Sequence, residues 1–485
     1  MAAVRLTRGS GWLLLVLWCI ALTGCAVNPV SGRSELMLLS EQDEVRLGRE
    51  TGQSVTREYG IYADAPLQSY VEGVGQPLAR ISHRPALPWQ FKVMDSPVVN
   101  AFAAPGGYIF VTRGLLAAVN DEASLAGVLA HEIGHVTARH SVRNYSQSLL
   151  AGLGVQLGTL VAGSYGDLLG PVLEAGTGLL FLKYSRDDER QADALAVEYA
   201  AKAGYDANRM ADFFTTLQRL ETLEGSRAGG LPEWFSTHPS PADRETSVRS
   251  QAAQWRSRLP GQTFRVNRDV YLDRIDGLLY GDDPRRGFRD GDWFFLPDLQ
   301  VQFRIPTQWS FAREGSQAQM QHPQKTGMVL FGVEAGSVDQ VSRAFLAAVK
   351  ATVEQSSERT INGLPARELV TTITDGKQRL RVLSHFFQKG TDVVVFHGVT
   401  AEQEYSRLAA TLAQPANSFA PLTDPAKLNR KPQRIAVKRL AQATTLQAAL
   451  QGFNVAPALW PRVAWLNEMR LDDHLPAGQR IKIVQ

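Results

Sequence analysis

Three histidines and a glutamate lie close together in the segment LAHEIGHVTARH, residues 129–140. His131 and His135 are four residues apart, so on a helix both rings project from one face and can bind a single ion. Neutral imidazoles suit Zn²⁺, and Glu132 is near enough along the helix to act on a water molecule at that ion. The preceding residues 121–130 have an amphipathic helical pattern, which gives the motif the context it needs. The alternative is that two core histidines and a surface glutamate share this spacing by chance.

A second group of candidate ligands lies downstream, in the segment SRDDERQADALA, residues 185–196. Glu189 and Asp193 are four residues apart and therefore share one face of the predicted helix. A catalytic zinc ion needs a third protein ligand and an open position for water. A solvated acidic helix face would have a similar composition, so the spacing alone leaves both interpretations open.

The N-terminal residues have the pattern of an export signal. Arg5 and Arg8 precede an apolar run over residues 12–22, which is too short to be a comfortable membrane span. We therefore predict a signal peptide over residues 1–24.

The residues that end this signal resemble a bacterial lipobox. In the segment LTGC, Cys25 would be acylated and become the first mature residue, which would hold the protein at a membrane surface. Ala26 follows instead of the aspartate that usually retains lipoproteins in the inner membrane, and this favours the outer membrane. An ordinary secretory signal is the alternative.

The composition excludes several classes of protein. The chain has 485 residues, 44% of them hydrophobic, which is enough for two to four domains. A formal net charge of +3 without a long basic run gives no indication of nucleic-acid binding. The only cysteines are Cys19, which would be lost with the signal, and Cys25. Cysteine-protease and zinc-ribbon interpretations are therefore excluded.

The predicted fold class is multidomain α+β. A tether over residues 25–39 is expected to lead into a mainly helical metallopeptidase domain over residues 40–260. An α+β sandwich domain is expected over residues 265–425, and a linker with a small βααβ module over residues 426–485.

Individual elements follow from local patterns. Ser40 has the features of a helix N-cap, and residues 89–96 alternate like a strand. In the second domain we predict strands at 299–311, 327–335, 366–375, 380–388 and 392–400, and helices at 341–355 and 402–419. The apolar, glycine-rich segment 149–182 is interrupted by polar residues, so a packed helical hairpin is expected there and not a membrane span.

The motifs together resemble one enzyme family. VVNAFAAPGGYIFVTRGLL, LAGVLAHEIGHVTARH and SRDDERQADALA, in that order, resemble the gluzincin metallopeptidases of the HtpX and CAAX prenyl protease type, particularly their soluble periplasmic BepA-like branch. The likeness covers residues 40–258. It implies a zincin fold with one Zn²⁺ per chain, Glu189 as the third zinc ligand, and Asp193 as the carboxylate that orients a ligand histidine.

The same resemblance assigns further residues around the metal. His238 and Arg244 match a His-Pro segment followed by arginine; His238 would be a fourth ligand that keeps the enzyme latent, or would stabilise the oxyanion. An exposed loop histidine is the alternative. We expect Arg244 beside the ligands. His140 follows His135 at a poor spacing for the same ion, so we also expect it to support the ligands or the fold.

A substrate-binding edge is implied as well. In the family the segment NAFAAPGG, residues 100–107, borders the active-site cleft, where an extended peptide could add as a strand. Asn100, Ala101 and Phe102 would contact that peptide. The alternative is a plain turn.

The other two domains carry weaker resemblances. Residues 265–425 loosely resemble sandwich domains of the PsbP and Mog1 type, and the C-terminal residues resemble a LysM module. Gln442-Ala443-Thr444 replaces the usual Gly-Asp before the Thr-Leu of that module. Glycan binding and a purely structural or docking role therefore both remain open.

The resulting prediction is a zinc endopeptidase of the bacterial envelope. We expect Glu132 to act as general base, and the substrates to be misfolded or stalled envelope proteins, as in quality control. The protein would lie in the periplasm, anchored to the outer membrane by lipid on Cys25. Two alternatives are an outer-membrane assembly factor with latent proteolysis and a peptidoglycan-associated factor. No nucleic-acid partner is expected.

Overall fold

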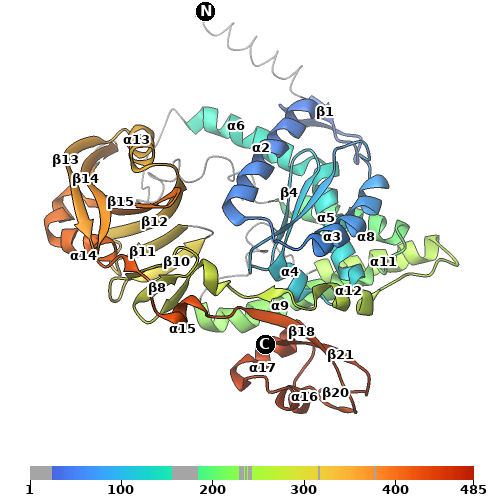
Figure 1. Ribbon diagram of the computed structural model, residues 1–485. Coiled ribbons are helices and arrows are strands. Elements are labelled where there is room, and N and C mark those ends of the chain that lie inside the picture. The colour runs from blue at the N-terminus through green and yellow to red at the C-terminus, as the bar shows by residue number, and fades with distance from the viewer. Residues whose placement is uncertain are drawn as a thin grey trace, which may run out of the picture. The chain divides into compact units, whose positions relative to one another are not determined.

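The computed structural model of the protein forms two compact units (Figure 1). It describes residues 25–155, 184–228, 234, 238, 243–314, 317–375 and 378–485. The first unit combines the residues up to Tyr280 with Arg434–Gln485, and the second contains Gly281–Gln433. The sequence placed the start of the second domain at residue 265, about one short helix too early. The predicted signal peptide and most of the apolar segment 149–182 lie outside the described residues.

After a short N-terminal segment, the first unit has two helices against a small sheet. Ser40 caps the first helix by accepting a hydrogen bond from the backbone of Asp43 at 3.2 Å, at the predicted start. The sheet has the order β3-β5-β4; β3 runs parallel to β5, and β4 is an antiparallel edge strand. The elements are α2 (Glu41–Tyr59), α3 (Ala65–Arg80), β3 (Gln90–Met94), β4 (Ala101–Ala104) and β5 (Tyr108–Thr112).

The centre of this unit is a helix that is buried along its whole length. All residues of α5 (Glu122–Thr137) are buried, because neighbouring helices and the sheet surround it. It packs closely on α8 (Arg186–Lys202): a Cβ at Gly134 would lie 3.2 Å from Ala192 Cα. Within the described residues this region also contains α4 (Arg113–Ala118), α6 (His140–Val155), α9 (Asn208–Ala228), α11 (Arg244–Arg258) and α12 (Arg268–Ile275). None of the helices in the described ranges is long and apolar enough to cross a membrane.

The segment predicted to be a tether is folded. β1 (Cys25–Val27) and β2 (Ser34–Leu36) pair as an antiparallel hairpin. The Asn28 side chain, fully buried, donates a hydrogen bond to Ala138 O at 3.1 Å. Buried backbone polar groups require such partners, so this hairpin is tied to the end of α5.

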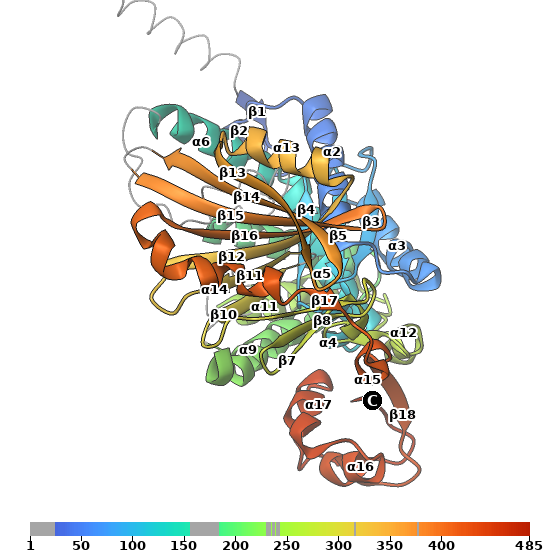
Figure 2. The ribbon, with the colours of Figure 1, turned by 60° about the vertical axis from the view of Figure 1, so that its left-hand side comes forward.

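The second unit is built on an antiparallel seven-stranded sheet with the order β10-β11-β12-β16-β15-β14-β13 (Figure 2). α13 (Val338–Ala348) packs on one face through Phe345. α14 (Tyr405–Asn417) packs on the other, together with a four-stranded sheet of order β17-β9-β8-β7. The strands are β7 (Phe288–Asp290), β8 (Trp293–Leu296), β9 (Val301–Arg304), β10 (Ser310–Glu314), β11 (Gln317–Gln321), β12 (Gly327–Ala335), β13 (Thr352–Ile361), β14 (Leu364–Asp375), β15 (Gln378–Lys389), β16 (Asp392–Ala401) and β17 (Ala420–Pro421).

One predicted helix in this unit is too long. The helical pattern over residues 341–355 continues past Ala348, but the helix stops there and β13 begins at Thr352. Lys350 has φ +49°, a left-handed turn that no helix continues through. The β-branched Thr352 and Val353 then pair with β14.

The C-terminal segment has the predicted order of strand, two helices and strand. These elements are β18 (Gln433–Arg439), α16 (Leu446–Gly452), α17 (Trp460–Leu466) and β21 (Arg480–Val484). β18 lies between β21 and β6 (Leu279–Tyr280), so the peptidase part of the first unit supplies the third strand of this sheet. The likeness to a LysM module stays a prediction.

Candidate metal centre

Two helices bring the first three candidate ligands together. His131 and His135 on α5 have their Nε2 atoms 3.0 Å apart, and Glu189 on α8 approaches both, with Oε1 3.4 Å from His135 Nε2 and Oε2 3.6 Å from His131 Nε2. A capping box at Ser185 starts α8, so Glu189 lies in its first turn. All three side chains are buried. The four-residue spacing of His131 and His135 therefore places both rings on one face of α5, as predicted.

His238 joins this group from a distant part of the chain. Its Nδ1 lies 3.0 Å from Glu189 Oε1 and 3.4 Å from His131 Nε2, and one donor atom from each of the four residues lies within 4.8 Å of the others. Its ring stacks on Trp234, with ring centroids 4.5 Å apart. His238 is therefore buried beside the other candidate ligands, and the exposed-loop alternative is wrong for its side chain.

The donor set fits a zinc ion. Three imidazole nitrogens and one carboxylate are ligands that Zn²⁺ prefers. Both Glu132 carboxylate oxygens and His238 Nε2 are buried without a hydrogen-bond partner in the described part of the chain. Buried polar atoms are normally satisfied, so the site suits an ion and a polar reactant.

Neighbouring polar side chains contact the candidate ligands His131, His135 and Glu189. Asp193 Oδ1 lies 3.0 Å from His131 Nδ1, and His140 Nδ1 lies 2.9 Å from His135 Nδ1. Arg244 donates to both Asp193 oxygens at 2.7 Å, and its Nη1 lies 2.8 Å from Glu189 Oε2. Such partners fix the tautomer and ring orientation of ligand histidines.

Two residues that contact this centre, Tyr184 and Gln191, were not predicted from the sequence. Tyr184 stacks on His135 at 3.8 Å between ring centroids, and Gln191 Oε1 lies 2.9 Å from His140 Nε2. Gln191 lies within the segment 185–196 that was singled out, and Tyr184 immediately precedes it. The helical period would have placed Gln191 on a neighbouring face, but nothing in the sequence indicated its partner.

The electrostatics give His135 and Glu189 the protonation states that zinc ligands need. Burial lowers the pKa of His135 well below its usual value, which keeps the imidazole neutral. Burial would raise the pKa of Glu189, but the charge of His238, hydrogen bonds and the charge of Arg244 lower it well below its usual value. Burial raises the pKa of Glu132, although His238 and His131 oppose that rise. Burial alone would lower the pKa of His238, but the charges of Glu189 and Glu132 raise it above its usual value.

The predicted substrate-binding segment forms the edge strand β4 and the turn after it. Asn100 precedes the strand; it is buried, and its Oδ1 has no hydrogen-bond partner in the described residues. Ala101 is buried, and Phe102 stacks on Phe110 at 5.1 Å between ring centroids. A helix packs tightly behind the following turn, where a Cβ at Gly48 would lie 1.8 Å from Pro105 O.

Comparisons with known proteins agree with this geometry. Residues 66–252 match the model of Peptidase family M48. The mitochondrial metalloendopeptidase OMA1 of Schizosaccharomyces pombe is 32% identical over 247 residues, which are 50% of this chain and 69% of that protein. The beta-barrel assembly-enhancing protease of Escherichia coli O157:H7 is 27% identical over 258 residues, 52% of this chain and 51% of that protein. This chain thus spans about half the length of the bacterial relatives that it matches.

Among solved structures, cyanobacterial PsbP from Synechocystis sp. PCC 6803 is matched over 28% of this chain and 91% of its own, with 14% identity and a TM-score of 0.23. The PsbP-like character of the second unit stays a prediction.

Proposed function

Because the chain belongs to peptidase family M48, we propose that it is a zinc-dependent endopeptidase whose metal is held by His131, His135 and Glu189. The observation that carries this proposal is the buried cluster of donor atoms with the Glu132 carboxylate beside it. Zn²⁺ bound there would polarise a peptide carbonyl and lower the pKa of a water molecule towards about 7.

Glu132 is the proposed general base. Its two oxygens are buried and have no hydrogen-bond partner in the described residues, so they are free to accept a proton from water. Burial raises the pKa of this carboxyl, which makes it a better proton acceptor than a solvated glutamate. The same carboxyl would then donate the proton to the leaving amine.

The neighbouring side chains hold this arrangement. We assign Asp193 and His140 to the orientation of the ligand histidines, and Arg244 to the orientation of Glu189 and Asp193. The position of His238 supports its role as a fourth ligand in a resting state. A site with four protein ligands is closed, as in structural zinc sites, so catalysis would require His238 to leave.

An extended peptide is the proposed substrate form. β4 is at the edge of its sheet, where backbone groups can pair with an added strand. Asn100, Ala101 and Phe102 would contact this strand, with Asn100 Oδ1 accepting a hydrogen bond from the peptide. Main-chain pairing gives little sequence preference, which suits an enzyme that acts on unfolded chains.

The proposed substrates are misfolded or stalled proteins of the bacterial envelope. Relatives named beta-barrel assembly-enhancing protease support this choice. We propose a periplasmic location with a lipid anchor on Cys25 in the outer membrane. Replacing Cys25 by serine should release the protein from the membrane fraction, and unchanged fractionation would argue against the anchor.

A second candidate function is assembly of outer-membrane proteins with proteolysis held latent. The close approach of His238 to Glu189, at 3.0 Å, favours it. A chaperone role would survive loss of Glu132, whereas proteolysis would not.

The test combines zinc content with cleavage of casein by the purified protein. The variants are Glu132→Gln and His238→Ala, and Glu72→Gln on the exposed face of α3 is the matched control. One zinc per chain, no cleavage by Glu132→Gln and faster cleavage by His238→Ala would support a latent protease. Zinc without cleavage in any variant would favour the assembly function. Absence of zinc would refute the metal site.

A further inference from the structure

The C-terminal segment, residues 434–485, shares a sheet and a core with the peptidase part of the first unit. Ile435 on β18 accepts a hydrogen bond from Gly277 N and donates one to Leu278 O, both at 2.8 Å. Trp465 on α17 is buried and donates from Nε1 to Thr216 O on α9 at 2.8 Å. The segment is therefore joined to the peptidase by backbone pairing and by buried side chains.

One of these buried side chains is a lysine. Lys482 on β21 has no exposed surface, and its Nζ lies 2.7 Å from Ala117 O, 3.3 Å from Ala118 O and 3.0 Å from Val119 O. These carbonyls end α4, where a helix leaves its acceptors unpaired and favours a cation. Burial lowers the pKa of Lys482 to about 7, but the three acceptors match the three N–H groups of an ammonium ion. We assign the ammonium form on this geometry.

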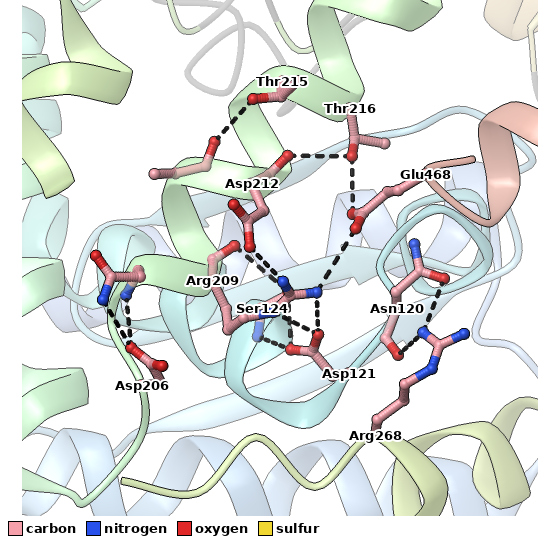
Figure 3. Close-up of polar contacts among 12 residues, drawn as sticks. Asn120, Asp121, Ser124, Asp206, Arg209, Asp212, Thr215, Thr216, Arg268 and Glu468 are labelled. Carbon is pink, nitrogen blue, oxygen red and sulfur yellow. Dashed lines mark hydrogen bonds and ion pairs between the residues drawn. The ribbon is translucent and has the colours of Figure 1, made fainter. Parts of the chain in front are cut away.

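A second contact runs from the same segment to the start of α5 (Figure 3). Glu468 Oε1 accepts a hydrogen bond from Thr216 Oγ1 at 2.9 Å, and its Oε2 lies 3.6 Å from Arg209 Nη2. Arg209 in turn lies 2.6 Å from Asp121 Oδ2. Asp121 is the N-cap of α5 and accepts from the backbone of Ser124 at 2.8 Å.

A third contact holds Asn120, which lies between Val119 and Asp121. Arg268 donates from Nη1 to Asn120 O at 3.2 Å (Figure 3). Its Nη2 donates to Arg480 O at 3.3 Å. Residues 117–121 are thus contacted on several sides, directly or through an arginine, by the C-terminal segment.

This short stretch leads directly into α5, the helix that carries two of the proposed zinc ligands. His131 follows Asp121 by ten residues, which is about 15 Å along a helix. Interiors are close-packed, so a helix that is buried along its length moves as a rod and transmits a displacement of its end.

The backbone of Glu468 supports a specific role for that residue. Its φ of +58° lies in the left-handed region, which is unfavourable for a side chain of this kind. Such a conformation persists when surrounding contacts enforce it, and here it accompanies the contacts to Thr216 and Arg209.

We propose that Lys482 and Glu468 are positioning residues of the peptidase, which hold α5 by its N-terminal end so that His131, Glu132 and His135 keep their geometry. The inference rests on the proposed function. It makes the C-terminal segment a working part of the peptidase unit and not an appended binding module.

The test uses the full chain with two substitutions and two matched controls. Glu468→Gln keeps an acceptor for Thr216 but removes the charge that faces Arg209, and Lys482→Met removes the buried ammonium. The controls are Asp472→Asn, an exposed carboxylate of the same segment, and Lys438→Met on the adjacent strand β18. The readouts are kcat and KM for a quenched fluorescent peptide, the d–d absorption of the Co²⁺-substituted protein, and the thermal unfolding midpoint.

Positioning predicts that kcat falls about tenfold or more, because a misplacement of about 1 Å costs on the order of 100-fold. KM should change little, since the peptide is expected on β4, and the Co²⁺ spectrum should change although the protein is folded. The controls should resemble the wild type.

A lower unfolding midpoint with kcat and the Co²⁺ spectrum of the wild type would show a purely structural role and overturn the proposal. Should Lys482→Met fail to fold, the milder Glu468→Gln decides between these outcomes. A wild-type protein that binds Co²⁺ but cleaves no peptide would refute the proposed function, while the Co²⁺ spectra of the variants would still test the positioning.

Discussion

Substitution of Arg244 by methionine should destabilise the first unit and weaken its proposed zinc site together. The Arg244 side chain is 2% exposed and makes close contacts with Asp193 and Glu189. Methionine would keep an apolar stem near Phe214, over which the guanidinium now lies at 4.4 Å, but would leave the two carboxylates without their cation.

The expected magnitude follows from the cost of an unpaired buried charge. Removal of one partner from a buried ion pair costs about 3–5 kcal/mol of unfolding free energy. Glu189 and Asp193 both retain a histidine neighbour, so we apply the value for a single pair and do not double it. For a unit of this size, the corresponding fall in the unfolding midpoint is on the order of 10 °C.

Differential scanning calorimetry in the presence of chelator measures this effect without a contribution from bound zinc. The matched control is Arg249→Met, one and a half turns further along α11, where the arginine is 42% exposed and pairs with Asp212 and Glu245. Exposed pairs contribute less than about 1 kcal/mol, so the control should shift the midpoint by only a few degrees. Arg244→Lys should lie between, since lysine keeps the charge and loses the planar fork. Equal midpoints for Arg244→Met and Arg249→Met would refute this reasoning.

Three further predictions concern other parts of the molecule. Chelation of zinc should lower the unfolding midpoint of the first unit and added Zn²⁺ should restore it, whereas an unchanged midpoint would count against the metal site. Burial lowers the pKa of His397 to about 4, below about 6.5 in the unfolded chain, so the unfolded state binds more protons between these values and the second unit loses stability as pH falls. The full pKa shift corresponds to about 3 kcal/mol of unfolding free energy. Because His397 is only half-buried, we expect the unfolding free energy from chemical denaturation to be about 1–2 kcal/mol lower at pH 4 than at pH 7. His397→Gln should remove this difference. Gly48→Ala should lower the unfolding free energy by about 1–3 kcal/mol, because its Cβ would lie 1.8 Å from Pro105 O. Gly73→Ala on α3 should raise it slightly, because a Cβ there would meet nothing within 4 Å. Equal effects of the two substitutions in urea denaturation would contradict this reasoning.

The centre of the site was predictable because its residues obey a local rule. His131 and His135, and likewise Glu189 and Asp193, are four residues apart, and the helical period alone places each pair on one face. That the two faces meet depends on tertiary packing, and here the family resemblance supplied what the spacing could not.

Two of the parts that failed depend on contacts between distant segments, and the third depends on a local turn. Lys482 lies in an alternating strand pattern, where a charge is expected to face solvent, yet it is fully buried against the end of α4. The fold around Asn28 was likewise hidden, because a short polar segment carries no periodic signal. The helix over residues 341–355 was too long because its continuing apolar pattern concealed a left-handed turn at Lys350.

The folded N-terminal hairpin limits how far the catalytic unit can move from a membrane attachment point. A flexible tether of 15 residues would let the catalytic unit wander by about 20 Å from its attachment point. With β1 and β2 paired and Asn28 bonded to Ala138, that freedom is absent from Cys25 onwards. Lipid on Cys25 would then keep helix α5, with its proposed zinc ligands, at a nearly constant distance from the bilayer. The enzyme would act on chains that come to the membrane surface and would have little reach into the space beyond it.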